Sequence, residues 1–360
     1  SSTAGREISG GRVSSVARMA SSVLADDVHA ARIREAGDLL ASALELEKGR
    51  RLKAQLPAAL GSALLMIGSR VDDALAAIRK AGSGHGGDTD AKLQRASSAL
   101  LGLQDDVMAL AEPDEGTVRW VDDSTSPSLR LAPIDVGDLL EEGLWSKRTA
   151  VLTSATLPAT LGEQLGFPEG SYDVLDVGSP FHYEDQALLY CTTHLPDPRS
   201  AAFEAALHDE LRTLITAAGG RTLALFTSHR AMRAAAEALA DELPGRLLTQ
   251  TDLPKPALIE AFSSDESASL FATQSFWQGV DVPGPSCSLV TIDKLPFSRP
   301  DDPLLQARRE QARADAFRLV DLPRATTLLA QGAGRLIRTA TDTGVVAVFD
   351  PRLAKAGYRW

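Results

Sequence analysis

The chain has 360 residues, of which 37 are Lys or Arg and 48 are Asp or Glu, for a formal net charge of −11. This length is typical of two or three packing units rather than one core. No apolar run is long enough to span a bilayer, and the first residues lack the apolar stretch of a secretory signal, so we expect a cytoplasmic protein. The excess of acidic residues argues against a nucleic-acid binder with a generally basic surface. It does not exclude a local basic groove on an acidic protein.

The two cysteines, Cys191 and Cys287, lie in apolar stretches that resemble strands. Small buried thiols are typical of such places. An iron–sulfur cluster normally takes four thiolates, so we do not expect this chain to ligate one. No His or Cys group has the spacing of a zinc site. We therefore expect no metal ligands in the chain.

The first third of the chain predicts a bundle of long helices, because its apolar residues recur at steps of three and four. We expect one helix over residues 16–46, with Met19 and Leu39 among its inward positions. Further apolar stripes run over residues 52–78 and 93–110, with a glycine-rich link between them. An isolated coiled coil is the alternative, but the stripes are wider than a strict seam.

The pattern changes at Gly116. After it, we expect two strands, a short helix and then a buried strand over residues 150–157. This last strand ends in hydroxyl residues. From about Gln186 to the end, apolar strands alternate with amphipathic helices. This alternation predicts an α/β fold with a parallel sheet that helices cover on both faces.

Ligands of such sheets bind beyond the carboxyl ends of the strands. Polar or small residues follow two of the expected strands: Thr227 and Ser228 after one, and Thr273, Ser275, Gly279 and Asp281 after the other. Hydroxyl groups at a helix start either cap the helix or hold a phosphate. Both interpretations stay open for Thr227 and Ser228.

Near the C-terminus, Gln331, Arg335 and Arg338 are spaced to share one face of an expected helix. Two guanidinium groups on one face repel each other unless an anion lies opposite. A triphosphate satisfies this requirement, since arginine stabilises the charge that develops in phosphoryl transfer. A structural pair with local carboxylates is the alternative.

Four segments in this order resemble motifs III to VI of the DinG/XPD family of superfamily 2 helicases: TSATL (153–157), LFTSHRAM (225–232), SFWQGVDVPG (275–284) and QGAGRLIR (331–338). The resemblance covers roughly residues 117–358. It implies two RecA-like lobes, with a helical arch inserted into the first. Residues 1–115 are then an arch-like insertion, residues 116–185 the end of the first lobe, and residues 186–360 the second lobe.

The resemblance also implies roles for single residues. Arg335 is expected to be the arginine finger for the ATP γ-phosphate, with Gln331 and Arg338 beside it. The remaining expected roles are nucleotide contact for Gly279 and Asp281, single-stranded DNA backbone contact for Thr227, Ser228, Thr273 and Ser275, and coupling of the two sites for Ser154 and Thr156.

The sequence departs from the family by lacking both a G-x-x-x-x-G-K-[ST] phosphate loop and a DEAH box. We therefore expect the C-terminal half of a longer, monomeric ATP-dependent helicase, in which ATP and Mg²⁺ are bound mostly by the missing lobe. The family implies single-stranded or forked DNA as partner, 5′–3′ movement, and a role in repair or replication. This chain alone is not expected to hydrolyse ATP. The alternative is a non-catalytic module that binds single-stranded nucleic acid.

Overall fold

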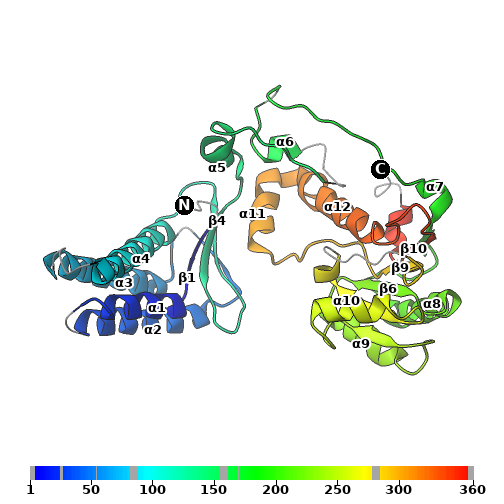
Figure 1. The fold of residues 1–360 in the computed structure, drawn as a ribbon, viewed down its shortest axis with the longest axis horizontal. Coiled ribbons are helices and arrows are strands. Elements are labelled where there is room, and N and C mark those ends of the chain that lie inside the picture. The colour runs from blue at the N-terminus through cyan, green and yellow to red at the C-terminus, as the bar shows by residue number, and fades with distance from the viewer. Residues whose placement is uncertain are drawn as a thin grey trace. The chain divides into compact units, whose positions relative to one another are not determined.

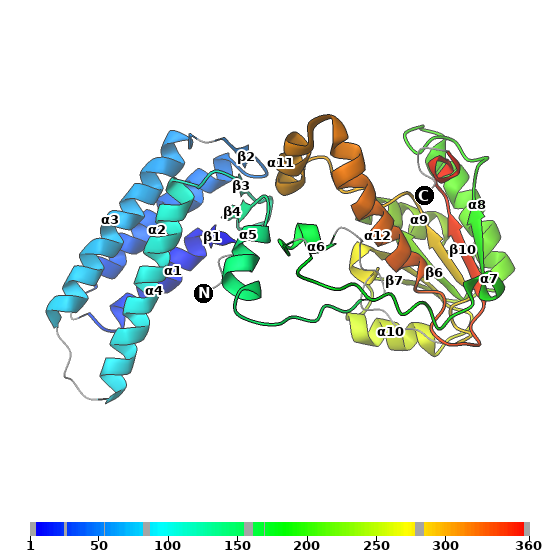
Figure 2. The same ribbon diagram turned by 90° about the horizontal axis from the view of Figure 1, so that it is seen from above.

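The computed structural model describes residues 5–24, 27–53, 55–81, 87–154, 161–168, 170–277 and 284–355. The chain forms two compact units (Figures 1 and 2). The first unit comprises residues 1–152, 159–172 and 300–316, and the second comprises residues 153–158, 173–299 and 317–360. The expected division into three domains at residues 115 and 185 stays a prediction.

Four helices make the bundle of the first unit: α1 (Gly10–Ser21), α2 (Val28–Leu46), α3 (Ala58–Ala81) and α4 (Gly87–Ala111). Their inward side chains share one core, which confirms the predicted bundle. The single helix expected over residues 16–46 is wrong, because the chain turns between α1 and α2. Met19 and Leu39 are consequently exposed. A count of apolar steps does not detect this turn, since both helices carry the same period.

The first unit also contains a four-stranded antiparallel sheet in the order β1-β4-β3-β2. Its strands are β1 (Arg6–Ile8), β2 (Arg51–Leu52), β3 (Thr117–Val121) and β4 (Leu129–Pro133). The strands β3 and β4 were expected, whereas β1 and β2 are too short to show a period. Leu52 therefore lies in a strand, and α3 begins only after Pro57, a residue that suits a helix start.

Helix α11 (Pro303–Ala312) belongs to the first unit, although the chain on either side of residues 300–316 belongs to the second. Hydrogen bonds made by two arginines hold it there. The Nη1 and Nη2 atoms of Arg51 donate to the carboxylate of Glu310 at 2.7 and 2.9 Å, and Nε of Arg308 donates to the carbonyl of Ile134 at 2.9 Å. The helix ends before Arg313, which has a φ of 50°.

The expected buried strand at residues 150–157 is wrong in its described part. Residues 150–154 adopt no regular structure, and Val151 is 85% exposed. A strand requires a neighbour for its backbone hydrogen bonds, and none of the described residues pairs with this segment. The nearby helical turns are α5 (Gly137–Leu140), η1 (Glu141–Trp145) and α6 (Leu161–Gln164).

The second unit is built on a six-stranded parallel sheet in the order β5-β10-β9-β6-β8-β7. The strands are β5 (Ala187–Cys191), β6 (Thr222–Phe226), β7 (Leu247–Thr249), β8 (Ser269–Thr273), β9 (Leu289–Ile292) and β10 (Gly344–Val348). Every residue of β6, β8 and β9 is buried, as expected for strands that are covered on both faces. This sheet confirms the predicted α/β, RecA-like fold.

Helices pack on both faces of this sheet (Figure 2). One core contains side chains of α8 (Phe203–Ala218) and α9 (His229–Leu239), and the other contains side chains of α10 (Lys255–Ser263) and α12 (Leu322–Ala333). The short elements are α7 (Tyr183–Gln186), η2 (Gln274–Phe276), η3 (Arg313–Asp315), η4 (Phe317–Asp321) and η5 (Pro351–Ala354). Gly219 ends α8 with a left-handed φ of 67°, as its position after the helix predicts.

Within the described part of the chain, no helix is long and apolar enough to cross a membrane. The same residues contain no group of three or more His, Cys, Asp or Glu that could hold a metal ion.

Candidate functional site at the carboxyl ends of the parallel strands

Three polar residues meet where neighbouring strands of the parallel sheet end. Thr227 follows β6, Thr273 ends β8 and Asp293 follows β9, and these strands are adjacent in the order β9-β6-β8. Parallel strands end at the same edge, so the fold brings together residues that are far apart in the sequence.

Asp293 is a buried carboxylate that holds Thr227. Its Oδ1 accepts the N–H of Thr227 at 2.8 Å, and its Oδ2 accepts the Oγ1 hydroxyl at 3.1 Å. Burial raises the pKa of Asp293 to about 7, against the opposite effects of the Thr227 hydrogen bonds and the charge of Lys294. The sequence analysis missed this residue, although an acidic residue directly after an apolar strand was a detectable signal.

Ser228 caps helix α9. Its Oγ accepts the backbone N–H of Ala231 at 3.1 Å, and the side chain is exposed. The structure shows the capping interpretation for Ser228, and contact of Thr227 and Ser228 with a phosphate stays a prediction. Thr227 is also exposed at this edge of the sheet.

Thr273 is held by hydrogen bonds to Gln250, which follows β7. The N–H and the hydroxyl of Thr273 both donate to Oε1 of Gln250, at 2.7 and 3.0 Å. The amide Nε2 of Gln250 lies 3.1 Å from Nδ1 of His229. The sequence analysis missed Gln250 as well. A lone glutamine after a short strand carries no signal until its partners are known.

Ser275 is exposed, and its carbonyl accepts a hydrogen bond from Nζ of Lys255 at 2.8 Å. Ser154 is exposed in the segment without regular structure. Three further expected site residues, Thr156, Gly279 and Asp281, lie outside the described residues.

The expectation that Gln331, Arg335 and Arg338 share a helix face is wrong. Helix α12 ends at Ala333, so that only Gln331 is helical and both arginines lie in the following turn. Two glycines at 332 and 334 weaken the helix at this point. The N–H of Gly334 still bonds to the carbonyl of Ala330, at 2.9 Å.

Asp342 shapes the turn that carries the arginines. Its Oδ2 accepts the backbone N–H groups of Arg338 and Thr339 at 2.8 and 2.7 Å, and its Oδ1 accepts the Thr339 hydroxyl at 2.8 Å. Burial acts to raise the pKa of Asp342, but these hydrogen bonds, together with one from the N–H of Gly284, hold it below its usual value. A charged Asp342 therefore replaces the helical hydrogen bonds that the backbone loses here.

Arg335 is anchored to the other motif-bearing loop. Its Nε donates to the carbonyl oxygen of Trp277 at 2.9 Å. Trp277 is fully buried, and a Cβ built on Gly332 meets its Cε3 atom at 3.2 Å. Gly332 thus permits the close approach of α12 to Trp277, which in turn positions Arg335.

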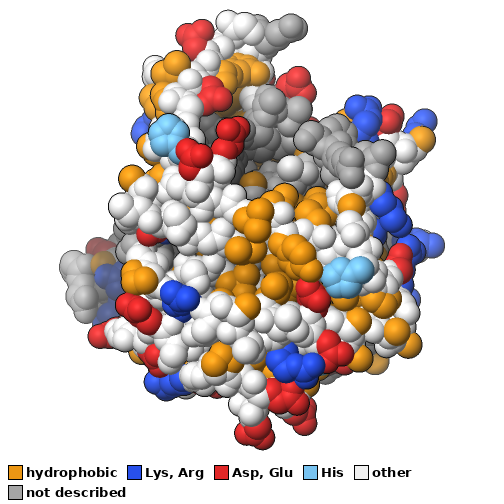
Figure 3. Space-filling model, turned by 90° about the vertical axis from the view of Figure 1, so that its right-hand side faces the viewer, with side chains coloured by type: hydrophobic (Ala, Val, Ile, Leu, Met, Phe, Trp, Pro, Cys, Tyr) orange, Lys and Arg blue, Asp and Glu red, His pale blue; other side chains and the backbone are white. Residues whose placement is uncertain are grey.

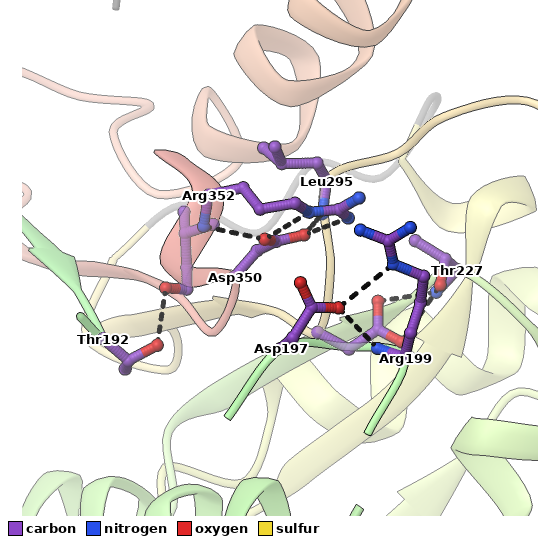
Figure 4. A network of polar contacts seen from close by, with 9 residues as sticks. Thr192, Asp197, Arg199, Thr227, Leu295, Asp350 and Arg352 are labelled. Carbon is purple, nitrogen blue, oxygen red and sulfur yellow. Dashed lines mark hydrogen bonds and ion pairs between the residues drawn. The ribbon is translucent and has the colours of Figure 1, made fainter. Parts of the chain in front are cut away.

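Polar groups also gather at the neighbouring strand ends (Figure 4). Asp350, fully buried after β10, accepts the N–H of Leu295 at 2.9 Å and pairs with Arg352 at 2.6 Å. Asp197 pairs with Arg199 at 3.2 Å in the loop before α8. The edge thus carries two buried carboxylates, Asp293 and Asp350, and the more exposed pair of Asp197 and Arg199.

Residues 211–360 match the family model of the helicase C-terminal domain. ATP-dependent helicase DinG of Mycobacterium tuberculosis is 46% identical over 274 residues, which cover 69% of this chain and 40% of that protein. ATP-dependent DNA helicase YoaA of Escherichia coli is 41% identical over 240 residues, which cover 64% of this chain and 37% of that protein.

The solved structure of S. tokodaii Xpd4 has a TM-score of 0.61 to this chain at 15% identity, covering 97% of this chain and 68% of that one. This likeness shows the shared fold. The chain spans 40% or less of the length of the two helicases it matches. From the matching domain, the identity to these helicases and the common fold, the chain belongs to the DinG/XPD family of helicases and corresponds to their C-terminal region.

Proposed function

We propose that the chain is the C-terminal half of an ATP-dependent DNA helicase that moves along single-stranded DNA, in the 5′–3′ direction, during repair or replication. One observation carries this proposal. The two motif-bearing loops of the second unit are joined through Arg335 and Trp277, at the end of a RecA-like sheet. Residues 186–360 then act as the second motor lobe, residues 1–115 as the arch-like insertion, and residues 116–185 as the end of the first lobe.

On the nucleotide side, Arg335 is proposed as the arginine finger. Donors that are already in place when charge develops need no reorganisation, which makes their stabilisation of a transition state effective. The bond from Nε of Arg335 to Trp277 supplies such an orientation. Gln331 and Arg338 are proposed as its neighbours at the phosphates, and Gly279 and Asp281 as residues that line the cleft.

On the DNA side, Thr227, Ser228 and Ser275 are exposed, which supports backbone contacts that are independent of base sequence. The hydroxyl of Thr273 donates to Gln250. We therefore propose that Thr273 supports the loop, so that its contribution to DNA binding is indirect. Ser154 and Thr156 are proposed to couple the nucleotide state to the DNA grip.

The first lobe is proposed to supply the phosphate loop, the DEAH box and thus most of the contacts to ATP and Mg²⁺. Exposed apolar residues support this: Val174, Leu175 and Val177 lie in a segment without regular structure. Leu188 and Leu189 are exposed on edge strand β5. Because successive strand residues point to opposite faces, each face of β5 has one exposed leucine. Apolar side chains also gather on the face in Figure 3.

The test compares this chain with the complete helicase. The chain alone is expected to show no DNA-stimulated ATP hydrolysis. In the complete protein, Arg335→Ala should lower the turnover number by about a thousandfold or more, with single-strand binding largely retained. Arg233→Gln, on the exposed side of α9, is the control and should be neutral. Unchanged turnover in the Arg335 variant removes this residue from its role. DNA binding by the complete protein without any turnover favours the non-catalytic module.

A further inference from the structure

A pocket of about 390 Å³ lies beside the proposed DNA contacts, lined by residues that no motif includes apart from Arg230 and Ala231. Its walls come from the loop before α8, the first turns of α8 and α9, and Lys294 after β9. Asp293, which precedes Lys294, is the residue that binds Thr227. The pocket therefore lies near the edge of the sheet where DNA is proposed to lie.

The pocket walls are positively charged, although the chain as a whole carries a formal charge of −11. Arg199, Arg230 and Lys294 line it, together with one carboxylate, Glu204. Arg230 pairs with Glu204 and Arg199 pairs with Asp197, each at 3.2 Å, and all four side chains are at least 41% exposed. Such pairs contribute little and exchange readily with other partners.

Lys294 is the best-placed cation in the pocket. Its Nζ lies 5.1 Å from the ring centroid of Phe203, an arrangement that holds an ammonium group without neutralising it. Among the described residues, no ion pair joins Lys294 to a carboxylate. The first turns of α8 and α9 add the partial positive charge of two helix N-termini.

His208 also lines the pocket. Its Nε2 is buried and has no hydrogen-bond partner among the described residues. Burial lowers the pKa of His208, against the opposing charges of Glu204 and Asp209. His208 is therefore a neutral part of the wall and adds no charge to it.

We propose that this pocket binds a backbone phosphate of single-stranded DNA, next to the nucleotide held at Thr227 and Ser228, through Lys294, Arg230 and Arg199. The proposal rests on the proposed function for the source of the phosphate. A free phosphorylated molecule offers the same chemistry, and a volume of this size also admits a small ligand. The experiment therefore includes both sources.

The first measurement is binding of a fluorescein-labelled oligodeoxythymidylate of 20 nucleotides to the full chain, by anisotropy at several NaCl concentrations. Each lost phosphate contact on a single strand lowers the slope of log K against log salt by about 0.7, which corresponds to about fivefold weaker binding at 0.1 M salt. Arg230→Gln and Lys294→Gln should each show this loss. Lys294→Arg should restore binding, and Arg233→Gln, on the same helix but outside the pocket, should leave affinity and slope unchanged.

The second measurement is calorimetric titration of the wild type and the Arg230→Gln/Lys294→Gln variant with inorganic pyrophosphate. Loss of pyrophosphate binding with unchanged DNA affinity overturns the DNA assignment in favour of a free phosphorylated ligand. If the wild type and the variants bind DNA equally well, and their pyrophosphate binding does not differ, the pocket proposal is overturned while the proposed function stands. A wild type that binds no DNA even at low salt overturns the proposed DNA binding itself, and this proposal with it. Circular dichroism of each variant confirms its fold.

Discussion

Asp293 and Thr227 join the ends of two neighbouring strands, because one carboxylate accepts both the backbone N–H and the hydroxyl of the threonine, at 2.8 and 3.1 Å. Asp293 follows β9 and Thr227 follows β6, and these strands are paired. The position of the proposed DNA-contacting loop therefore depends on a buried acid whose pKa is raised to about 7.

This carboxyl group makes stability depend on pH. Its pKa is about 7 in the folded state against an ordinary value of 3.8, so the folded protein keeps a proton that the unfolded chain releases. The free energy of unfolding should therefore fall as pH rises from about 4 to about 7, by at most about 4 kcal/mol from this group. Asp293→Asn imitates the protonated form and should lack this component. Urea unfolding of both proteins between pH 4.5 and 8 measures the difference, and parallel pH profiles contradict the prediction.

Gln250 is predicted to support the loop after β8. Gln250→Ala removes the acceptor of two Thr273 donors, one of them a buried backbone N–H. A buried donor without a partner costs about 1–3 kcal/mol. Gln250→Glu keeps an acceptor oxygen and should lose less. The control is Gln274→Ala, an exposed side chain in η2, for which denaturant unfolding should give little change. Equal stability of Gln250→Ala and the wild type would refute this role.

Two glycines in helices are predicted to respond to alanine in opposite directions. At Gly102 in α4, nothing lies within 4 Å of an added Cβ, so Gly102→Ala should stabilise the protein by up to about 1 kcal/mol through helix propensity.

At Gly332 in α12, an added Cβ meets Trp277, Ile292 and Leu225 at 3.2, 3.3 and 3.4 Å. All three neighbours are buried, and overpacking of such a core costs about 1–3 kcal/mol. Gly332→Ala should therefore be destabilising overall. Thermal unfolding of both variants tests the pair, and a stabilised Gly332→Ala protein would show that the neighbours give way.

The bond between Arg51 and Glu310 is predicted to hold α11 on the first unit. Arg51→Glu and Glu310→Arg should each increase hydrogen exchange of α11, while the double exchange of charges restores protection. The expected coupling energy is small, about 0.5–1 kcal/mol, since Glu310 is largely exposed. Arg50→Glu breaks a comparable pair with Glu47 at 2.9 Å that does not involve α11. It should leave α11 unaffected, and the same exchange increase there would contradict the assignment.

Much of the parallel sheet could be predicted from sequence because its signals are local. The run from Leu223 to Phe226 is apolar, lies between Gly220 and a helix start, and is fully buried in the sheet. In α8, Leu207, Leu211 and Ile215 recur every four residues and all face the core. Burial of these side chains is favourable wherever the sheet forms, so a repeating pattern is sufficient to reveal them.

The errors arose where local pattern and tertiary environment disagree. The apolar segment at residues 150–154 has the composition of a strand, but without a neighbouring strand it stays exposed. Residues 331–338 have helical spacing, but α12 ends at Ala333 and Asp342 binds the backbone N–H of Arg338. In both cases, the backbone follows its hydrogen-bond partners rather than the spacing of its side chains.

By itself, the sequence determined the helical bundle, the alternating strands and helices, and the loops in which polar residues gather, since each depends on residues only a few positions apart. The tertiary structure decided which of these residues act together. Asp293 binds Thr227 from 66 positions away and Arg335 reaches Trp277 across 58. Such pairs depend on the order of strands in the sheet, and no local property of either residue encodes that order.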